Sequence, residues 1–416
     1  MRDFFNASAP VHFTFPIDGD FLNRYDGVEK DGSLTVKVRL KAPFDAELSV
    51  NGIPCDRDAE TGEYSCDVVL DHFRNTLAAV DRKNGYRAEI RVYRGYEPTN
   101  KVYFTVDDAV IFLYDLTFAP EKYPSIFDHP FLNTFKTAHD LYGTTVNLHI
   151  YYAYDETCMD DFTNHKKYFD LSMMPDRWKS EWQANANWLT LSYHAHANYP
   201  NEPFKVQSRE FVNADIKRVH KEICRFAGEE CLSCCTVQHF GNGYIENLRA
   251  FRENGYKLLG GSFRILDDTE PYMGFYGADG LPAHIRGVGQ DAYDRNAETA
   301  LDVSRAPDGE ATRTVRVIEG ETGRDFWHDH REDITYVRTD MVLNVVEQER
   351  IVPWLDEHFK VPQRCGFFTP MIHEEYFYED YKVYIPDCRE RVLTACKYAA
   401  EHGYKGCHPK WVALER

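Results

Sequence analysis

The sequence predicts a mixed α/β protein: an immunoglobulin-like β-sandwich at residues 1–106, followed by a distorted (β/α) barrel at residues 107–416. Three observations predict this fold class. The 416 residues exceed one ordinary domain and suit two. The first hundred residues contain short strand-like segments separated by turn signals. From Val110 onward, strand-like and helix-like segments alternate, which is typical of a parallel sheet or barrel.

The N-terminal segments have the composition of β-strands. They are rich in β-branched residues and show no helical period. Turn signals such as Asp31-Gly32 and Asn51-Gly52 separate them. The predicted strands are LTVKVRL, AELSVNG, YSCDVVL, YRAEIRVYRG and KVYFTV. Several strands at this spacing favour an immunoglobulin-like sandwich.

The C-terminal part begins with a different rhythm. VIFLYDL (110–116) is a continuous apolar run that ends in a carboxylate, as expected of a buried parallel strand. FLNTFKTAHDLYG predicts a helix that ends at Gly143, and TTVNLHIYY predicts the next strand. WLTLSYHAHAN is a further strand, and REFVNADIKRVHKEICRFAG is an amphipathic helix. These steps predict βαβ units.

The same alternation continues to the chain end. IENLRAFRENGYKLLGGSF predicts a helix and a strand, whereas residues 267–330 are rich in Gly, Asp and Pro and predict long loops. ITYVRTDMVLNVV and GFFTPMIHEEYF predict late strands. RERVLTACKYAAEHGYKGC predicts a closing helix with a last short strand.

The charge of the chain excludes some classes of partner. With 67 acidic and 48 basic side chains, the net charge is −19, which disfavours binding to nucleic acids and anionic membranes. No apolar run reaches the length of a membrane span, and the first residues lack the pattern of a signal peptide. We therefore expect a cytoplasmic protein, with no expectation for its oligomeric state.

Metal-capable side chains follow several predicted strands. Asp115, His194 and His373 stand at strand ends, His196 and Asn198 follow His194, and His239 precedes a glycine-containing turn. Polar residues at the carboxyl ends of parallel strands converge on one face of a barrel. On a strand, His194 and His196 would point to the same face. Catalytic zinc takes three such ligands and leaves one position for water. Each residue alone also fits a structural role in hydrogen bonding.

Residues 107–416 resemble the polysaccharide deacetylase superfamily, whose members remove N- or O-acetyl groups from sugars. The resemblance is carried by VIFLYDLTFAP with the helix and strand after it, LSYHAHANYPNEPF, VQHFGNGYIENLRAFRENGYKLLGGSF and TPMIHEEYF with its late helix. It implies that Asp115 and His194 bind a divalent metal and that His373 protonates the leaving group. It also implies a carbohydrate substrate. Zinc is the expected ion, with nickel, cobalt or manganese as alternatives.

The sequence departs from the family pattern at three places. Asn198 occupies the position of the second metal histidine, so His196, Asn198 or His239 would complete the metal site. Tyr114 precedes Asp115, where the family has its general-base aspartate. The arginine that pairs with that base is replaced by His239.

The remaining assignments concern the general base and the substrate. Asp267, Asp268 or no separate base would serve in place of the missing aspartate. Substrate contacts are expected from Tyr114, Gly241, Asn242 and Trp327, the last in a segment that predicts a solvated loop or the lip of a cleft. Two alternatives stay open. One is a metal-assisted glycoside hydrolase, with Glu374 or Glu375 facing Asp115. The other is a non-catalytic carbohydrate-binding protein.

Overall fold

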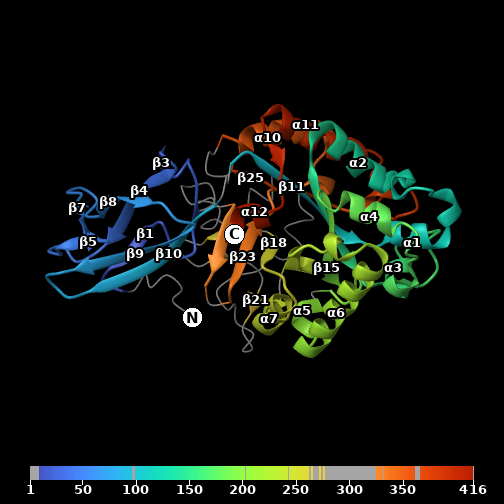
Figure 1. Cartoon of the computed structure of the whole chain (residues 1–416), viewed down its shortest axis with the longest axis horizontal. Helices are drawn as coiled ribbons and strands as arrows, with labels where there is room; N and C mark the ends of the chain where they lie inside the picture. The colour runs from blue at the N-terminus through green and yellow to red at the C-terminus, as the bar shows by residue number, and fades with distance from the viewer. Residues whose placement is uncertain are drawn as a thin grey trace.

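The computed structural model describes residues 9–95, 99–201, 203–241, 243–261, 264–265, 271–272, 275–276, 325–330, 332–360 and 366–415. Figure 1 shows a β region at one end of the molecule, from β1 to β10, and an α/β region of parallel strands and helices at the other. Mixed sheets and helices thus confirm the α/β class.

The β region consists of two five-stranded sheets. The first contains β1 (His12–Phe15), β3 (Gly27–Lys30), β4 (Ser33–Lys41), β7 (Asp56–Arg57) and β8 (Tyr64–Leu70). The second contains β2 (Phe21–Leu22), β5 (Leu48–Val50), β6 (Ile53–Pro54), β9 (Arg74–Asp81) and β10 (Arg87–Arg94). Apolar side chains alternate with polar ones along β4, and its buried Val36 and Val38 share one core with Leu77 and Val92 of the other sheet. The predicted strands are present, while their immunoglobulin-like connectivity stays a prediction.

The α/β region is built around a seven-stranded sheet, in which β15, β12, β11, β26 and β24 lie side by side in parallel. Its strands are β11 (Lys101–Ala109), β12 (Thr145–Tyr151), β15 (Leu189–Ala195), β24 (Met341–Val342), β25 (Phe367–Phe368), β26 (Pro370–His373) and β27 (Lys405–Gly406). Every residue of β12 and β15 is buried. Burial on both faces explains the continuous apolar character of these strands.

A second group of strands continues the arrangement beside β15. It contains β16 (Cys235–Val237), β18 (Leu258–Gly261) and β23 (Ile334–Arg338) in parallel, and β22 (Phe326–Asp329) antiparallel to β23. Side chains connect β16 to the first sheet: the Thr236 hydroxyl donates to the Tyr193 carbonyl, and Asn147 Nδ2 donates to the Cys235 carbonyl at 3.0 Å. Among the described residues no backbone ladder joins the two groups. Closure of the strands into a barrel therefore stays a prediction.

The helices of the α/β region cover its sheets (Figure 1). They are α1 (Ile111–Phe118), α2 (Pro130–Tyr142), α3 (Glu156–Met159), α4 (Lys179–Asn185), α5 (Pro203–Val206), α6 (Arg209–Phe226), α7 (Ile245–Glu253), α10 (Ile351–His358), α11 (Cys388–Glu401) and α12 (Lys410–Ala413). The predicted helices α2 and α6 are confirmed. Pro130 starts α2 and Gly143 ends it with a φ of 68°. Ser208 caps α6, whose Ile216 and Val219 are fully buried.

The strand predicted at residues 101–106 is confirmed, but its assignment to the β-sandwich was wrong. The segment forms part of β11, which pairs in parallel with β12 and β26. The expected domain boundary between residues 106 and 107 falls inside that strand. Residues 102–107 are all buried, as in a strand covered on both faces.

The prediction of a strand at residues 110–116 was also wrong, because the chain there forms helix α1. The Glu374 carboxylate accepts hydrogen bonds from the backbone N–H groups of Val110, Ile111 and Phe112, at 2.5, 2.9 and 2.6 Å. These bonds satisfy the first donors of the helix. An apolar run buried on all sides has no period that separates a helix from a strand, and the residue that caps this helix lies far away in the sequence.

The segment around Trp327 is likewise not a solvated loop. It forms β22, and Trp327 is fully buried, with its Nε1–H donating to the Asp18 carbonyl at 2.8 Å and its ring stacked on Tyr336. Trp327 therefore joins the β region to the α/β region, and its burial leaves no surface for the substrate contact that we predicted.

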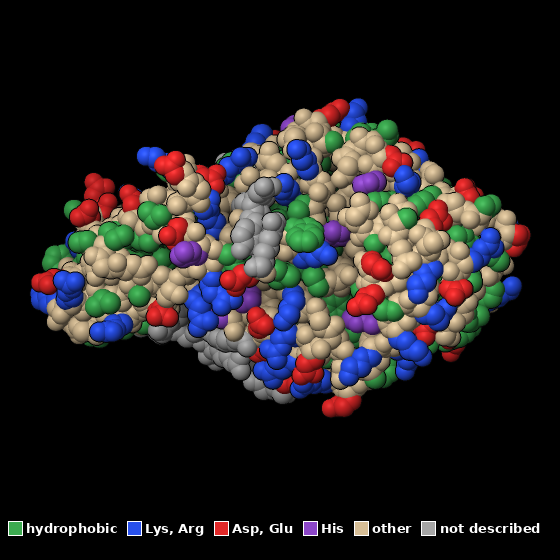
Figure 2. All heavy atoms as spheres, viewed as in Figure 1, with side chains coloured by type: hydrophobic (Ala, Val, Ile, Leu, Met, Phe, Trp, Pro, Cys, Tyr) green, Lys and Arg blue, Asp and Glu red, His purple; other side chains and the backbone are tan. Residues whose placement is uncertain are grey.

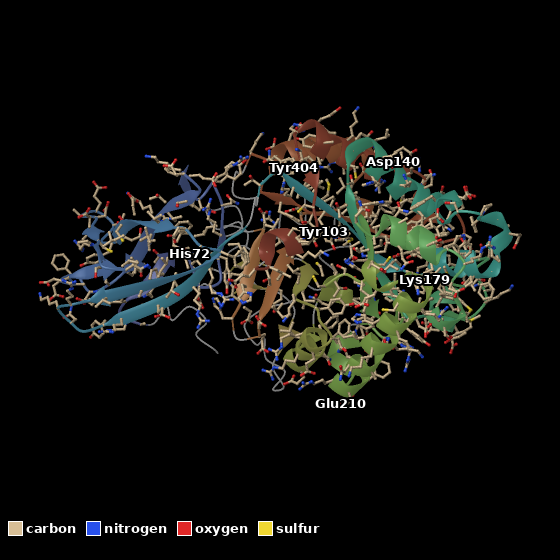
Figure 3. All side chains as sticks on the ribbon, in the orientation of Figure 1. His72, Tyr103, Asp140, Lys179, Glu210 and Tyr404 are labelled. Atoms are coloured by element: carbon tan, nitrogen blue, oxygen red, sulfur yellow. The ribbon has the colours of Figure 1, made fainter. Side chains whose placement is uncertain are left out.

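The surface is mixed in charge, and the interior is aromatic. On the face drawn in Figure 2, acidic and basic side chains are interspersed. Figure 3 labels two buried tyrosines, Tyr103 and Tyr404, and exposed side chains that include Asp140 and Glu210. Within the described residues, none of the helices combines the length and the apolar composition that crossing a lipid bilayer requires.

Candidate metal centre

Two adjacent carboxylates, Asp107 and Asp108, stand near the end of β11 and line one cavity. Side chains of consecutive residues in a regular strand point to opposite faces. Here the register of β11 against β12 shifts between Val106 and Ala109, and Asp108 has a φ of 59°. Such an irregularity changes the direction of a side chain at the cost of local strain. It allows both carboxylates to face the same space.

Asp108 forms a cluster with His194 and His239, which we call the cation cluster. Asp108 Oδ1 lies 2.9 Å from His194 Nε2 and 3.2 Å from His239 Nδ1. The two ring nitrogens lie 3.1 Å apart. His194 is the next-to-last residue of β15, and His239 stands two residues after β16, so the ends of β11, β15 and β16 bring the three side chains together.

In each histidine, one ring nitrogen faces away from Asp108 and bonds to a backbone carbonyl; we call it the outer nitrogen. His194 Nδ1 lies 2.7 Å from the Val237 oxygen, and His239 Nε2 lies 3.0 Å from the Asn198 oxygen. A carbonyl only accepts hydrogen bonds, so both of these nitrogens must carry hydrogen. If the rings are neutral, the other nitrogen of each ring, which we call the inner nitrogen, carries a lone pair and accepts hydrogen bonds. The two inner nitrogens face each other and the Asp108 carboxylate. The Tyr151 hydroxyl donates to Asp108 Oδ1 and lies 3.2 Å from His239 Nδ1, so one donor stands beside these acceptors. Two imidazole lone pairs that converge with a carboxylate fit a bound cation, and the outer bonds are those that orient metal-binding histidines.

The ionisation of the cluster favours a proton on His194 beside an ionised Asp108, and a cation that binds there would displace this proton. Burial would raise the pKa of Asp108, but the charge of His239 and the hydrogen bonds from both histidines lower it well below its ordinary value. Burial lowers the pKa of His239, and the nearby carboxylate opposes this only in part. For His194, burial would lower the pKa, whereas Asp108 and Asp107 raise it above its ordinary value. The carboxylate is thus ionised, as a metal ligand must be.

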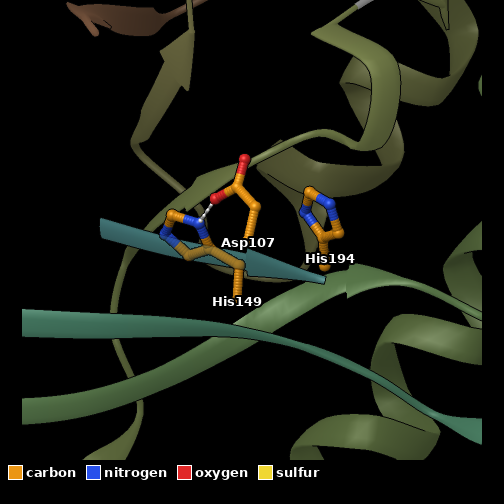
Figure 4. Close-up of side chains that lie close together, drawn as sticks. All are labelled: Asp107, His149 and His194. Carbon is orange, nitrogen blue, oxygen red and sulfur yellow. Dashed lines mark hydrogen bonds and ion pairs between the residues drawn. The ribbon is translucent and has the colours of Figure 1, made fainter. Parts of the chain in front are cut away.

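Asp107 pairs with a third histidine, His149, at the centre of β12. The His149 Nδ1–H donates to Asp107 Oδ1 at 2.6 Å, and Figure 4 shows the rings of His149 and His194 on either side of this carboxylate. Burial lowers the pKa of His149, which favours the neutral ring. Burial would raise the pKa of Asp107, but His149 lowers it below its ordinary value.

Asp107, His149 and His194 also lie close enough to hold an ion. We favour the cation cluster because the contact between Asp107 and His149 is already a complete hydrogen bond between a donor and an acceptor. All three residues of the alternative group are also buried, whereas Asp108 is partly exposed.

His373 completes the cavity. It pairs with Asp107 across β26 and β11 and lines the same space. The cavity encloses about 430 Å³, part of it open to solvent. His373 Nδ1 lies 2.9 Å from Asn344 Oδ1. This bond commits Nδ1 to Asn344, so Nε2 is the nitrogen with which His373 would exchange a proton.

Asp115 lies apart from the cation cluster. Because residues 111–118 form a helix, its carboxylate does not stand at a strand end, and it contacts His129 and His165 at 3.1 Å each. The predicted pairing of Asp115 with His194 is therefore wrong. Tyr114, predicted to contact substrate, is buried and packs edge-on against Phe118.

The segment after His194 divides between two roles. His196 Nδ1 bonds to Asp215 of α6 at 2.9 Å. His196 therefore does not point to the same face as His194, contrary to our prediction. Asn198 supplies the carbonyl that orients His239, and its side-chain oxygen accepts a hydrogen bond from the Tyr151 hydroxyl at 3.3 Å.

The other predicted residues have separate outcomes. Gly241 lines the cavity, and its N–H donates to the Gln238 carbonyl at 2.9 Å, which commits the donor that we expected to face the substrate. Asn242, Asp267 and Asp268 lie outside the described residues.

Sequence reasoning missed Asp107, Asp108 and His149. The signal that would have found the two carboxylates was present: they directly follow the apolar strand KVYFTV. The rule that polar residues at strand ends converge was applied to residues 110–116 instead, which form a helix.

Comparison with known proteins gives no family assignment. No family model matches the chain, and no curated protein matches it either. Among solved structures, the chain is similar to a protein from Mycobacterium smegmatis assigned as a polysaccharide deacetylase, with 12% identity and a TM-score of 0.34 over 77% of this chain and 95% of that one. It is also similar to a 4-α-glucanotransferase from Thermococcus litoralis, with 7% identity and a TM-score of 0.39 over 74% of this chain and 39% of that one. Because both TM-scores are low, the interpretation of the site rests on its own geometry.

Proposed function

We propose that this protein is a divalent-cation-dependent hydrolase that removes acetyl groups from a carbohydrate. One observation carries the proposal: Asp108 Oδ1, His194 Nε2 and His239 Nδ1 converge beside a cavity, and the outer nitrogens of both rings are held by carbonyls. Two imidazoles and one carboxylate suit zinc, with nickel, cobalt or manganese as alternatives. Three protein ligands leave a coordination position for water or substrate.

The residues around the cluster supply proton transfer. A cation held there would polarise a carbonyl group and make a water molecule more acidic. Asp107 is placed to accept a proton from the attacking water, and His149 holds this carboxylate ionised and oriented. His373, on the neighbouring strand and in the same cavity, would donate a proton through Nε2 to the departing oxygen or nitrogen.

The order of these residues strengthens the sequence resemblance on which the substrate class rests. In the deacetylase pattern, a general-base aspartate precedes the metal-binding aspartate. If Asp108 is the ligand, the residue before it is Asp107. The pair of aspartates is then present at residues 107–108, and not at residues 114–115, where we expected it. His239 takes the place of the second metal histidine, and His149 takes the place of the arginine that pairs with the base.

The test measures metal content and acetate release together. Wild-type protein loaded with Zn²⁺, Ni²⁺, Co²⁺ or Mn²⁺ is offered acetylated amino-sugar oligomers and acetylated xylan. We expect His194→Ala to lose both the metal and the activity. Asp107→Asn should keep the metal and lose at least ~100-fold in acetate release, as is typical of a removed general base. Wild-type protein that binds no divalent cation, or His194→Ala with full turnover, would contradict the proposal.

A further inference from the structure

A second cavity lies on the other side of Asp108. It encloses about 310 Å³, part of it open to solvent, and Asp108 lines both cavities. Its walls are largely aromatic and aliphatic, with carboxyl groups among them. We call it the tyrosine pocket; its lining includes Ile111, Tyr151, Tyr154, Phe162, Tyr381 and Glu375. A group bound here would lie next to the cation cluster, because Asp108 belongs to that cluster and also lines this pocket.

Glu375 places a buried carboxyl oxygen in this pocket without a hydrogen bond. Among the described residues its Oε2 has no partner. Its position is fixed by the preceding residue, because the Glu374 carboxylate accepts three backbone N–H groups at the start of α1. Leaving a buried polar atom unpaired costs free energy, so a water molecule, an ion or a bound ligand that pairs with it is favoured. Glu375 is thus held where it can meet a bound molecule.

Glu375 can hydrogen-bond to a ligand in either protonation state, because a carboxylate accepts hydrogen bonds and a carboxylic acid also donates one. Asp161, in the same lining, forms an ion pair with Lys382 at 2.6 Å. The pocket therefore presents an unpartnered carboxyl group among aromatic side chains.

The geometry points to a sugar-binding subsite: we propose that the tyrosine pocket holds a neutral sugar ring of the substrate, with the Glu375 carboxyl hydrogen-bonded to one of its hydroxyl groups. The inference rests on the proposed function for the identity of the reacting acetyl group. Tyr154, Phe162 and Tyr381 in the lining supply apolar aromatic surface that suits the C–H groups of a ring. In protein from which the cation has been removed, the charge of Asp108 disfavours an anionic sugar by repulsion, whereas Lys382 offsets the charge of Asp161.

The test compares two substitutions of Glu375 with a control on the same segment. Glu375→Gln keeps a hydrogen-bonding side chain of the same size, Glu375→Leu removes the hydrogen-bonding group, and Glu379→Gln changes an exposed carboxylate nearby. Calorimetry measures the binding of tetra-N-acetylchitotetraose to chelator-treated protein, so that the readout does not require turnover. We expect Glu375→Leu to weaken binding at least tenfold, Glu375→Gln to stay within threefold of wild type, and Glu379→Gln to have no effect.

A second measurement on wild-type protein does not depend on any variant folding. In chelator-treated wild type, an oligomer of the same length that carries uronic acids should bind at least tenfold more weakly than its neutral counterpart. Equal binding of the two oligomers, or Glu375→Leu with wild-type affinity, would overturn the subsite while leaving acetate release intact. If wild-type protein releases no acetate but Glu375→Leu still loses sugar binding, the hydrolase proposal fails and the subsite stands.

Discussion

Two clusters of histidine and carboxylate side chains lie in the α/β region, and they differ in the atoms that their histidine nitrogens contact. The cation cluster joins Asp108, His194 and His239. The second, which we call the bridging cluster, joins Asp115, His165 and Asp380. In it, His165 Nε2 lies 3.1 Å from Asp115 and His165 Nδ1 lies 2.9 Å from Asp380. Both contain the residue types from which metal sites are made.

The two clusters differ in the source of the positive charge that balances their carboxylates. Both nitrogens of His165 face carboxylates, so a protonated ring satisfies both with its two N–H groups. Burial would lower the pKa of His165, but the hydrogen bonds to Asp115 and Asp380 raise it above its ordinary value. In the cation cluster, carbonyls hold the outer nitrogens, and the inner ones face Asp108, with the Tyr151 hydroxyl beside them. A protonated His165 completes the bridging cluster, whereas we propose that a cation takes this part in the cation cluster.

The largest effect that we expect concerns metal affinity in a matched pair of aspartates. Asp108→Asn should weaken Zn²⁺ binding at least ~100-fold, beyond the 10–100-fold loss typical of residues that only orient a ligand. Asp115→Asn, the same chemical change in the other cluster, should leave affinity within about threefold, because Asp115 contacts no residue of the cation cluster. Calorimetric titration of chelator-treated protein measures both. A comparable loss in Asp115→Asn would erase the distinction between the clusters.

The outcome for these aspartates shows what the sequence could and could not reveal. Helices with a clear period and local end signals, such as α2 with Gly143, were predictable because the residues that shape them lie within the segment. His194 was predictable in the same way, at the end of a recognisable strand. Helix α1 was not, because its residues are apolar on all sides and its cap, Glu374, comes from the last part of the chain.

The ligand Asp108 was missed for a related reason. Its strand resembles the N-terminal strands in composition, and only the pairing of β11 with β12 and β26 places it at the centre of the parallel sheet. The irregularity that directs both Asp107 and Asp108 toward one cavity is a property of tertiary structure. The partners of the histidine nitrogens, which distinguish the two clusters, are also long-range contacts.

A smaller effect, on stability, should appear in the bridging cluster and depend on pH. His165→Phe removes the donor between two carboxylates that are mostly shielded from solvent. We expect it to lower the free energy of unfolding by about 3 kcal/mol at pH 5.5, the lower end of the range for a broken buried pair. Because the pKa of His165 is raised on folding, its stabilisation is complete below its unfolded value of about 6.5 and declines as the pH rises through the folded value.

The carboxylates of the bridging cluster determine the low pH at which its contribution to stability is lost. Burial would raise the pKa values of Asp115 and Asp380, but their hydrogen bonds with histidines lower them, so their contribution is lost only as the pH falls through these lowered values. Urea unfolding of wild type and His165→Phe at pH 5.5 and pH 8.5 should show the larger difference at pH 5.5. His72→Ala, at an exposed histidine, serves as the control. An equal difference at both pH values would contradict the assignment of the proton to His165.

The smallest effect should come from a histidine that stands two positions from a ligand. His196 lies next to β15, yet its Nδ1 bonds to Asp215 of α6 at 2.9 Å. His196→Ala should therefore cost only about 1 kcal/mol of stability, the value of one hydrogen bond, and leave Zn²⁺ affinity within about twofold. His194→Ala, on the same strand, provides the matched comparison, since it removes a ligand atom. If His196→Ala also released the ion, the ligand set would have to include the face of β15 that packs on α6, and the cation cluster as defined here would be wrong.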